Sequence, residues 1–242
     1  MKTSFLWTLA RGIYRSIHRF WRDIVLEQSP QKLWLFRTVR PYTLVKIPRL
    51  QTLYHVCETV EQEHVTGDIV ECGVWNGGSA AVMAYASRAS RPPRALHLFD
   101  SFQGLPLLTG KDGATAQKRW HPNYDLGFRH NVEKILFHKL RIPRERVHIY
   151  EGWFHETIPH ASIPSIAVLH IDADLYEPTK FCLETFYPAV TDKGYVAIDD
   201  YESWEGCKSA VDEFLANHPH LILRDSGAGG RYFQSLYTSK YT

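Results

Sequence analysis

The chain has 242 residues, a hydrophobic fraction of 44% and a formal net charge of +2, which together suit one large globular domain. The small net charge argues against a nucleic-acid-binding protein, and no apolar run reaches the ~20 residues that span a bilayer. The four cysteines form no CxxC pair and the 13 histidines form no zinc motif, so we expect buried free thiols and a cytoplasmic location.

The first predicted element is an amphipathic helix over residues 4–27, interrupted by Ser29-Pro30. Its apolar residues recur at steps of three and four, and arginines occupy its other faces. We expect the apolar stripe to pack on the protein body or on a second subunit, so a homo-oligomer is predicted. The alternative is a weak association of this helix with an anionic membrane surface. Two parts are therefore predicted, an N-terminal helix and arm (1–45) and a main domain (46–242).

After a predicted helix over residues 48–65, short strand, loop and helix patterns alternate from Gly67 onward. Residues 101–130 are expected to be loop-like, although they are too long for a plain connector. Helices are predicted at 80–89, 128–140, 178–190 and 206–217. Strands are predicted at 68–72, 95–99, 147–150, 165–171, 194–198, 221–224 and 231–236. This alternation predicts an α/β fold with a doubly wound, mostly parallel seven-stranded sheet and a helical N-terminal extension.

A glycine-rich turn, Gly73 to Ser79, follows the first strand and opens a helix. Glycine allows a ligand to approach the backbone, and a helix N-terminus offers unpaired N–H groups, although tight packing alone would also explain the glycines. Asp100 follows the next strand, where nucleotide-binding α/β folds carry an acid that accepts both ribose hydroxyls. Turn and acid together predict an adenosine-type ligand. A pyrophosphate is not required, since no lysine or arginine stands beside the turn.

Four aspartates follow two later strands: Asp172, Asp174, Asp199 and Asp200. Ligands of open α/β sheets bind at the carboxyl edge, and four carboxylates there would repel one another without a cation between them. Asp172, Asp199 and Asp200 suit a hard cation such as Mg²⁺, with helix capping as the alternative. A metal-coordinated hydroxyl has a lowered pKa, so Asp174 is placed to take its proton. Asp174 and Asp172 are the predicted catalytic residues.

Several other candidates remain open on position alone. Gly152-Trp153 would lie beside an adenine or pack in the core. His155 and His170 are candidate bases, although histidines with satisfied hydrogen bonds are the more usual case. Tyr42-Thr43 and Trp120-His121 are candidates for closing over the ligands.

The chain resembles the macrocin O-methyltransferase family over roughly residues 40–236, in the segments RPYTL, GDIVECGVWNGGSA, LFDSFQGLP, EGWFHETIP, IDADLYEPT and GYVAIDDYESWEGCKSAVDEF. The resemblance implies a class I, Rossmann-like methyltransferase domain over 46–242. It implies an enzyme that depends on S-adenosylmethionine and Mg²⁺ and methylates sugar hydroxyls on antibiotics, with a glycosylated small molecule as acceptor.

By the same resemblance, Asp172, Asp199 and Asp200 would hold Mg²⁺ and Asp174 would be the base. The residues implied to contact S-adenosylmethionine are Thr43, Glu71, Cys72, Gly73, Ser79, Asp100, Ser101, Gly152, Trp153 and Asp172. The N-terminal helix and residues 103–130 match the motifs poorly and are expected to shape the acceptor pocket.

Three alternatives remain. Nucleotide-sugar glycosyltransferases hold a diphosphate through a metal on a DxD motif, and one class of phosphatases uses a DxD nucleophile. The absence of a basic phosphate cradle near Gly73–Ser79 disfavours both. The third alternative is a non-catalytic scaffold that docks on a membrane through residues 4–27.

Overall fold

The structure is a computed structural model that describes residues 29–121 and 123–236. The chain divides into two compact units, Met1–Thr38 and Val39–Thr242. Helix α2 (Pro30–Val39) lies almost wholly in the first unit. Proline is well suited to the first helical position, so Pro30 begins a helix that the sequence reading had missed. The helix predicted over residues 4–27 lies outside the described residues.

The second unit is built on a seven-stranded sheet with the order β3-β2-β1-β4-β5-β7-β6. The first five strands are parallel, β7 runs antiparallel to β5, and β6 runs antiparallel to β7. The predicted doubly wound, mostly parallel sheet of seven strands is confirmed. The strands are β1 (Asp68–Cys72), β2 (Leu96–Asp100), β3 (Val147–Glu151), β4 (Ile166–Ile171), β5 (Val190–Ile198), β6 (Arg224–Gly227) and β7 (Gly230–Gln234).

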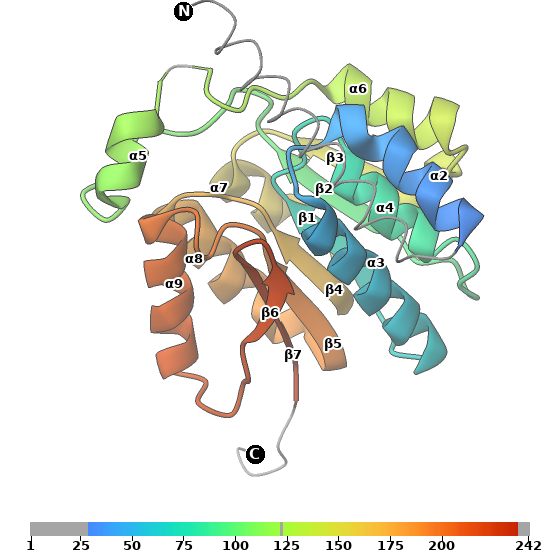
Figure 1. The fold of residues 1–242 in the computed structure, drawn as a ribbon. Coiled ribbons are helices and arrows are strands. Elements are labelled where there is room, and N and C mark those ends of the chain that lie inside the picture. The colour runs from blue at the N-terminus through green and yellow to red at the C-terminus, as the bar shows by residue number, and fades with distance from the viewer. Residues whose placement is uncertain (1–28, 122, 237–242) are drawn as a thin grey trace, which may run out of the picture. The chain divides into compact units, whose positions relative to one another are not determined.

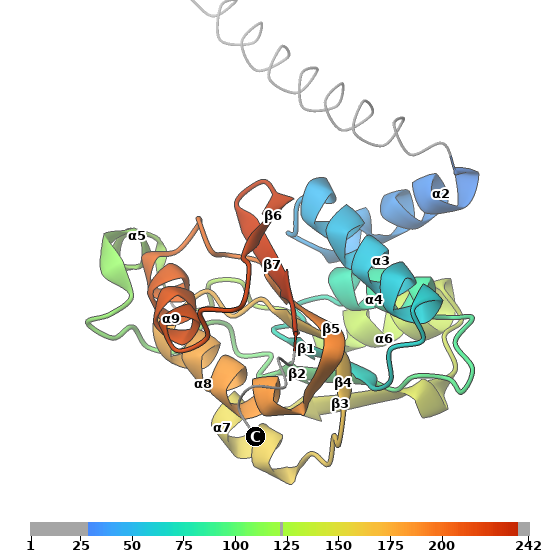
Figure 2. The ribbon, with the colours of Figure 1, turned by 90° about the horizontal axis from the view of Figure 1, so that it is seen from below.

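Helices cover both faces of this sheet. Figure 1 and Figure 2 show α3, α4 and α6 on one face and α7, α8 and α9 on the other. The helices of the second unit are α3 (Ile47–Gln62), α4 (Gly78–Ala86), α5 (Gly113–Arg119), α6 (Arg129–Glu133), α7 (Phe154–Thr157), α8 (Tyr176–Phe186) and α9 (Glu205–Ala216). Short helical turns lie at η1 (Arg40–Tyr42), η2 (Lys134–Lys139, a π-helix), η3 (Arg144–Arg146), η4 (Ile158–His160) and η5 (Tyr187–Ala189). None of the described helices is both long and apolar enough to cross a bilayer.

Two predicted elements are wrong. The segment 101–130 is not all loop, because Gly113–Arg119 forms α5, where alanine, glutamine, lysine and arginine favour a helix. Of the strand predicted at 221–224 only Arg224 pairs, because β6 begins there and runs to Gly227. The hairpin turn sets this boundary, since Gly227, Ala228 and Gly229 all adopt left-handed backbone conformations. Gly227 pairs with Gly230 across this turn, and the β6–β7 register that follows begins with Arg224 opposite Tyr232.

The centre of the sheet forms the core. Every residue of β4 is buried, as expected of a parallel strand with helices on both faces. The apolar side chains of β1 and β4 pack with α8, where Cys182, Leu183 and Phe186 are buried. The predicted free thiols are confirmed, because Cys57, Cys72, Cys182 and Cys207 are all buried and unpaired as disulfides.

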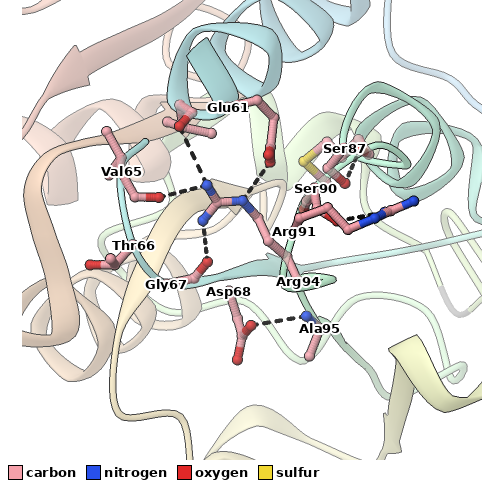
Figure 3. Close-up of polar contacts among 12 residues, drawn as sticks. Glu61, Val65, Thr66, Gly67, Asp68, Ser87, Ser90, Arg91, Arg94 and Ala95 are labelled. Atoms are coloured by element: carbon pink, nitrogen blue, oxygen red, sulfur yellow. Dashed lines mark hydrogen bonds and ion pairs between the residues drawn. The ribbon is translucent and has the colours of Figure 1, made fainter. Parts of the chain in front are cut away.

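One arginine holds the amino-terminal side of the sheet to α3. Arg94 lies two residues before β2. Its guanidinium donates to the carboxylate of Glu61 and to three backbone carbonyls in the last turn of α3 or after it. Figure 3 shows the guanidinium enclosed by these acceptors. The carbonyls belong to Val60, Val65 and Gly67. Because these carbonyls lie where α3 ends, Arg94 supplies partners that the helix itself cannot provide.

We expect Arg94→Met to lower the free energy of unfolding by about 2–4 kcal/mol, because it leaves a partly buried carboxylate and several carbonyls without donors. The measurement is chemical denaturation of the whole chain. Arg91→Met is the matched control, since Arg91 is exposed and donates to the neighbouring Ser90 carbonyl. Equal losses in the two variants would show that the Arg94 contacts contribute little.

Candidate active site at the carboxyl edge of the sheet

The sheet register brings the predicted site residues to one edge. Hydrogen bonds between neighbouring strands continue one residue past the paired strands and align the first residues beyond them. These bonds are Gly73 N to Phe99 O (2.9 Å), Gly152 N to Asp100 O (3.0 Å), Asp172 N to Cys72 O (2.8 Å) and Asp199 N to Ile171 O (3.0 Å). The glycine turn and the acids therefore share one edge because their strands are parallel and in register.

A cavity of about 330 Å³ lies at this edge. Most of the predicted site residues line it: Thr43, Gly73, Ser79, Asp100, Ser101, Gly152, Trp153, Asp172, Asp174, Asp199 and Asp200. Glu71 and Cys72 do not. Both are completely buried in β1, where Glu71 contacts His170. Most residues predicted to bind the methyl donor therefore share one cavity with the four predicted aspartates.

The glycine turn is required by the protein's own backbone packing. Gly73 has a φ of +87°, and a Cβ there would lie 1.8 Å from the carbonyl oxygen of Asp172. A Cβ on Gly78 would lie 2.5 Å from the Thr43 Cβ, so this glycine lets the residues after η1 pack against the start of α4. Tight packing, the simpler explanation, therefore holds for both glycines. Gly73 and Thr43 also line the cavity.

Asp100 organises the glycine turn. Its Oδ2 accepts the backbone N–H groups of Val74 (2.7 Å) and Trp75 (2.8 Å), and its Oδ1 accepts that of Phe102 (2.7 Å). Burial raises the pKa of Asp100, and the three N–H donors limit the rise. Because a carboxylate has about four acceptor positions, the remaining capacity lies on Oδ1. Asp100 can accept one further hydrogen bond more readily than two.

Three carboxylates form a compact group within the cavity. One oxygen from each of Asp172, Asp174 and Asp200 lies within 4.8 Å of the others. Burial raises the pKa of Asp172 well above its usual range, and the charges of Asp199 and Asp200 add to the effect. Burial, followed by Asp200, raises the pKa of Asp174 in the same direction. Buried carboxylates this close need a shared cation or protons.

Asp199 lies outside that compact group and is bound by an arginine. The Arg49 guanidinium donates to Asp199 Oδ2 and lies 3.6 Å from Asp200 Oδ1. Burial and the Asp200 charge raise the pKa of Asp199 to about 6, and Arg49 opposes the rise. The predicted metal ligands Asp172, Asp199 and Asp200 all line the cavity, but the structure groups Asp174 with two of them.

The donor set fits a hard divalent cation. All the candidate ligands are carboxylate oxygens, which Mg²⁺ prefers over nitrogen or sulfur. Asp199 Oδ1 is buried and has no hydrogen-bond partner among the described residues, while Oδ2 is bound by Arg49. A buried oxygen left without a donor is expected where a cation completes the site.

Arg49 is a site residue that the sequence reading missed. It lies in the first turn of α3, is 5% exposed, and also donates to the Ala228 carbonyl (2.6 Å) and the Ser203 hydroxyl (3.3 Å). One side chain therefore links α3, the acids after β5 and the β6–β7 turn. No local pattern marked Arg49, because it lies 150 positions before Asp199 in the chain.

The segment between β2 and α6 forms one wall of the cavity. Leu105, Arg119, Tyr124 and Asp125 line it, together with Trp204 from the turn before α9. Residues 103–130 thus contribute to the cavity lining, and their expected role in acceptor binding stays a prediction.

Asp112 anchors this wall to α8. Its buried carboxylate accepts the N–H of Tyr176 (2.8 Å) and both the N–H (2.6 Å) and hydroxyl (2.9 Å) of Thr109. Tyr176 begins α8, two residues after Asp174. The wall is therefore bonded directly to the chain that carries the predicted base.

Most of the remaining sequence candidates do not line the cavity: Tyr42, Trp120, His121, His155 and His170. His155 has a side chain that is 71% exposed on α7, and His170 is buried with its Nδ1 2.8 Å from Glu71 Oε1. Neither lines the cavity; His170 has a hydrogen-bond partner in Glu71, whereas His155 is exposed to solvent. Trp120 donates its indole N–H to the carbonyl of Pro106, a residue that lines the cavity (2.9 Å). His121 packs edge to face against Tyr124. Of the Tyr42-Thr43 pair, Thr43 lines the cavity.

Comparison with known proteins shows the family to which the chain belongs. A family model described as macrocin-O-methyltransferase (TylF) matches residues 36–222. Demethyldecarbamoylnovobiocin O-methyltransferase of Streptomyces niveus is 37% identical over 179 residues, which cover 72% of this chain and 68% of the relative. A second relative, from Streptomyces olivaceus, is 35% identical over 180 residues, covering 73% of this chain and 69% of its own. It is named 8-demethyl-8-(2,3-dimethoxy-alpha-L-rhamnosyl)-tetracenomycin-C 4'-O-methyltransferase.

Solved structures show the same fold. The O-methyltransferase NovP superposes with a TM-score of 0.72 at 33% identity, over 81% of this chain and 83% of NovP. TomG from Streptomyces achromogenes, solved in complex with SAM, superposes with a TM-score of 0.54 at 13% identity, over 80% of this chain and 82% of TomG. At that identity TomG shares the fold alone. The family match and the curated relatives confirm the resemblance found from the motifs, and the chain belongs to the macrocin-O-methyltransferase family of enzymes.

Proposed function

We propose that this protein transfers a methyl group from S-adenosylmethionine to a hydroxyl of a sugar or related polyol on a small-molecule metabolite, with Mg²⁺ bound at the acid cluster. One observation carries the proposal: the glycine turn and the carboxylates Asp172, Asp174 and Asp200 line a single cavity. A methyl donor and a hydroxyl acceptor must meet within one such space. The rhamnosyl acceptor in the name of a 35% identical relative supports a sugar substrate.

The methyl donor would lie over the glycine turn. Gly73, Ser79 and Thr43 offer a close backbone approach and hydroxyl groups there, Asp100 Oδ1 offers one acceptor for a ribose hydroxyl, and Gly152-Trp153 lies at the end of β3. TomG, which shares the fold, was solved in complex with SAM, and this supports S-adenosylmethionine as the ligand. Glu71 and Cys72 would contribute only through the backbone geometry of β1, since both are buried behind the lining.

The metal ion would be held by Asp172, by Asp200 and by Oδ1 of Asp199. When bound, Mg²⁺ supplies positive charge that lowers the pKa of a coordinated acceptor hydroxyl. The protein's own residues do the rest. Asp174 accepts the hydroxyl proton, and its burial keeps bulk water from competing for that proton. Holding the oxygen in line with the methyl group can lower the barrier by ~7–11 kcal/mol.

The lining argues against a nucleotide-sugar glycosyltransferase. The cations among the described lining residues are Lys46, Arg49 and Arg119. Arg49 is bound to Asp199, and Arg119 lies over the Trp204 ring at 5.5 Å. Among the described lining residues this leaves Lys46, and one lysine does not form the basic cluster that a diphosphate would need. A homo-oligomer, a cytoplasmic location and a domain boundary at 45/46 stay predictions.

Calorimetry tests the proposal. We expect S-adenosylhomocysteine to bind and UDP not to bind. A screen with methyl-labelled S-adenosylmethionine against glycosylated metabolites, rhamnosides first, should show transfer that chelator abolishes and Mg²⁺ restores. Binding of UDP without S-adenosylhomocysteine would favour the glycosyltransferase. Binding to anionic liposomes with affinity for neither nucleotide ligand would favour the scaffold.

Mg²⁺ binding should strengthen as pH rises. Burial and neighbouring carboxylates raise the pKa of Asp172, Asp174 and, to about 6, of Asp199. Between pH ~4 and these raised values the folded, metal-free protein binds more protons than the unfolded chain, so its stability falls as pH rises. Mg²⁺ needs the ionised carboxylates and should offset that loss.

The measurement is the thermal unfolding midpoint with and without Mg²⁺, at matched ionic strength with KCl as the control. We expect Mg²⁺ to raise the midpoint at about pH 8 and to have little effect at about pH 5. A shift of equal size at both pH values would contradict ionisation of the cluster on metal binding.

A further inference from the structure

Arg49 contacts the acid cluster but has no part in the proposed chemistry. Its Nη1 donates to Asp199 Oδ2 and lies 3.6 Å from Asp200 Oδ1. Arg49 and Asp199 are only 5% and 6% exposed, so solvent screens this ion pair far less than one at the surface. Separating the two side chains would leave two buried charges unpaired, which is strongly unfavourable. The contact is therefore a fixed part of the site.

The β6–β7 turn holds the Arg49 side chain in place. Nη2 donates to the Ala228 carbonyl (2.6 Å) and to the Ser203 hydroxyl (3.3 Å). A Cβ on Gly230 would lie 3.1 Å from the Cδ of Arg49, so the turn also packs closely on the aliphatic part of the side chain. Contacts at Cδ and at Nη2 together keep the guanidinium beside Asp199.

This position is unfavourable for one donor of Arg49. Its Nε is buried and has no hydrogen-bond partner among the described residues. An unpaired buried donor is destabilising and uncommon in native structures, so its retention needs an explanation. The contact between Nη1 and Asp199 supplies one, because it places the guanidinium where it controls an acid of the site.

Arg49 leaves Asp199 with one available oxygen. Oδ2 accepts from Nη1, whereas Oδ1 is buried and has no partner within the part of the chain that the structure describes. A second cation is repelled from an oxygen that already accepts from a guanidinium. Asp199 can therefore offer a metal ion Oδ1, but not both oxygens of its carboxylate.

This restriction bears on which cation fits the site. Mg²⁺ demands near-octahedral geometry and is bound through a few carboxylate oxygens and waters, whereas Ca²⁺ takes about 6–8 oxygens and often both oxygens of one carboxylate. A carboxylate that can use only one oxygen suits the smaller ion. Freeing Oδ2 of Asp199 would add a ligand atom that Ca²⁺ can use and Mg²⁺ does not need.

We propose that Arg49 is a positioning residue that makes the acid cluster selective for Mg²⁺ over Ca²⁺, by occupying Oδ2 of Asp199 and leaving Oδ1 for the metal. The inference rests on the proposed function and deepens it. The charge of Arg49 and its position have different consequences. Removing the charge strengthens the attraction of both divalent ions alike, whereas freeing Oδ2 favours the ion that takes more ligands. The ratio of the two affinities therefore isolates the effect of position.

The test compares Arg49→Met with Arg231→Met as a matched control. Arg231 lies on β7 beside the same turn, and its guanidinium binds Glu202 and Asp225. Its variant loses one positive charge while the described contacts of the acid cluster stay intact. Binding of MgCl₂ and of CaCl₂ to the chelator-treated full chain, saturated with S-adenosylhomocysteine, is measured by calorimetry at one ionic strength.

Arg49→Lys is a third variant, included because methionine leaves Asp199 unpaired and that variant could fail to fold. Lysine keeps the charge, but a single ammonium does not reproduce the planar fork that reaches Asp199, Ala228 and Ser203 together. It should change the metal preference in the same direction as methionine, by a smaller amount.

We expect the wild type to bind Mg²⁺ more tightly than Ca²⁺. Arg49→Met should shift the ratio of the two dissociation constants toward Ca²⁺ by about tenfold, the lower end of the usual effect of a residue that orients a metal ligand. Arg231→Met should match the wild type. S-adenosylhomocysteine affinity should be the same in all four proteins, because none of the described hydrogen bonds of Arg49 reaches a residue assigned to the methyl donor.

An unchanged ratio in every Arg49 variant that folds overturns the inference, and so does a wild type that binds Ca²⁺ at least as tightly as Mg²⁺. Both results leave methyl transfer standing. A wild type that binds neither ion overturns the inference together with the proposed metal role, whereas a wild type that does not bind S-adenosylhomocysteine rejects the proposed function itself.

Discussion

Replacing Asp174 with asparagine should lower the rate of methyl transfer by ~10²–10⁴-fold at saturating Mg²⁺ and cofactor, the usual contribution of a general base. Asp174 is buried in the cavity and has a φ of +56°. Asparagine adopts that conformation readily, so the fold should persist while the proton acceptor is lost. The measurement is kcat from labelled S-adenosylmethionine, with S-adenosylhomocysteine affinity by calorimetry expected to stay within a factor of about two.

Asp172→Asn is the companion variant, because it separates a base from a metal ligand. Asp172 and Asp174 lie in the same compact group of oxygens, so geometry alone would let either bind a cation. We expect Asp172→Asn to weaken Mg²⁺ binding, with excess Mg²⁺ restoring part of the rate. Excess Mg²⁺ should not restore Asp174→Asn. Rescue of both variants by metal would make Asp174 a ligand and leave the proton acceptor to be found.

Gly73→Ala should abolish cofactor binding and destabilise the fold by more than about 3 kcal/mol, through backbone strain plus a steric clash. The added Cβ would lie 1.8 Å from the Asp172 carbonyl oxygen, a backbone atom that cannot move without shifting β4. The φ of +87° adds to the cost. Chemical denaturation and S-adenosylhomocysteine calorimetry measure the two effects.

Gly110→Ala is the control for this substitution. A Cβ at Gly110 meets no atom within 4 Å, and its φ is not positive. Its variant should therefore fold and bind S-adenosylhomocysteine like the wild type. If Gly73→Ala keeps both stability and cofactor affinity, then the close approach of the turn to Asp172 is not needed for either property.

The acid-tipped strands could be predicted because two local signals coincide. Apolar runs such as Ile166–Ile171 predict buried parallel strands, and parallel strands share a carboxyl edge. Placing Gly73, Asp100 and Asp172 together therefore required only the order of strands along the chain. The family motifs strengthened that inference, since they lie at the same strand ends.

The partners of those acids could not be predicted in the same way. Arg49 reaches Asp199 from α3, and nothing in the local sequence around either residue indicates the contact. Asp199 therefore pairs with an arginine, while Asp174 joins the compact group. Asp125, which lines the cavity, was hidden for a different reason: its segment has no periodic pattern, and its position depends on the close approaches of Gly104 and Gly127 to distant backbone. Contacts between side chains and backbone that is distant in the chain produce no residue pattern in the local sequence, so they could not be predicted from it.

The bond from Asp112 to the first residue of α8 also bears on redesign. This hydrogen bond attaches the wall to α8 at Asp112, and the attachment does not involve the residues between Asp112 and α6. We therefore expect that replacing residues 113–125 with the equivalent segment of a relative changes the acceptor preference to that of the relative. Binding of the methyl donor should stay unchanged. Such an exchange would replace part of one cavity wall while Trp204, which lies outside that stretch, stays in place.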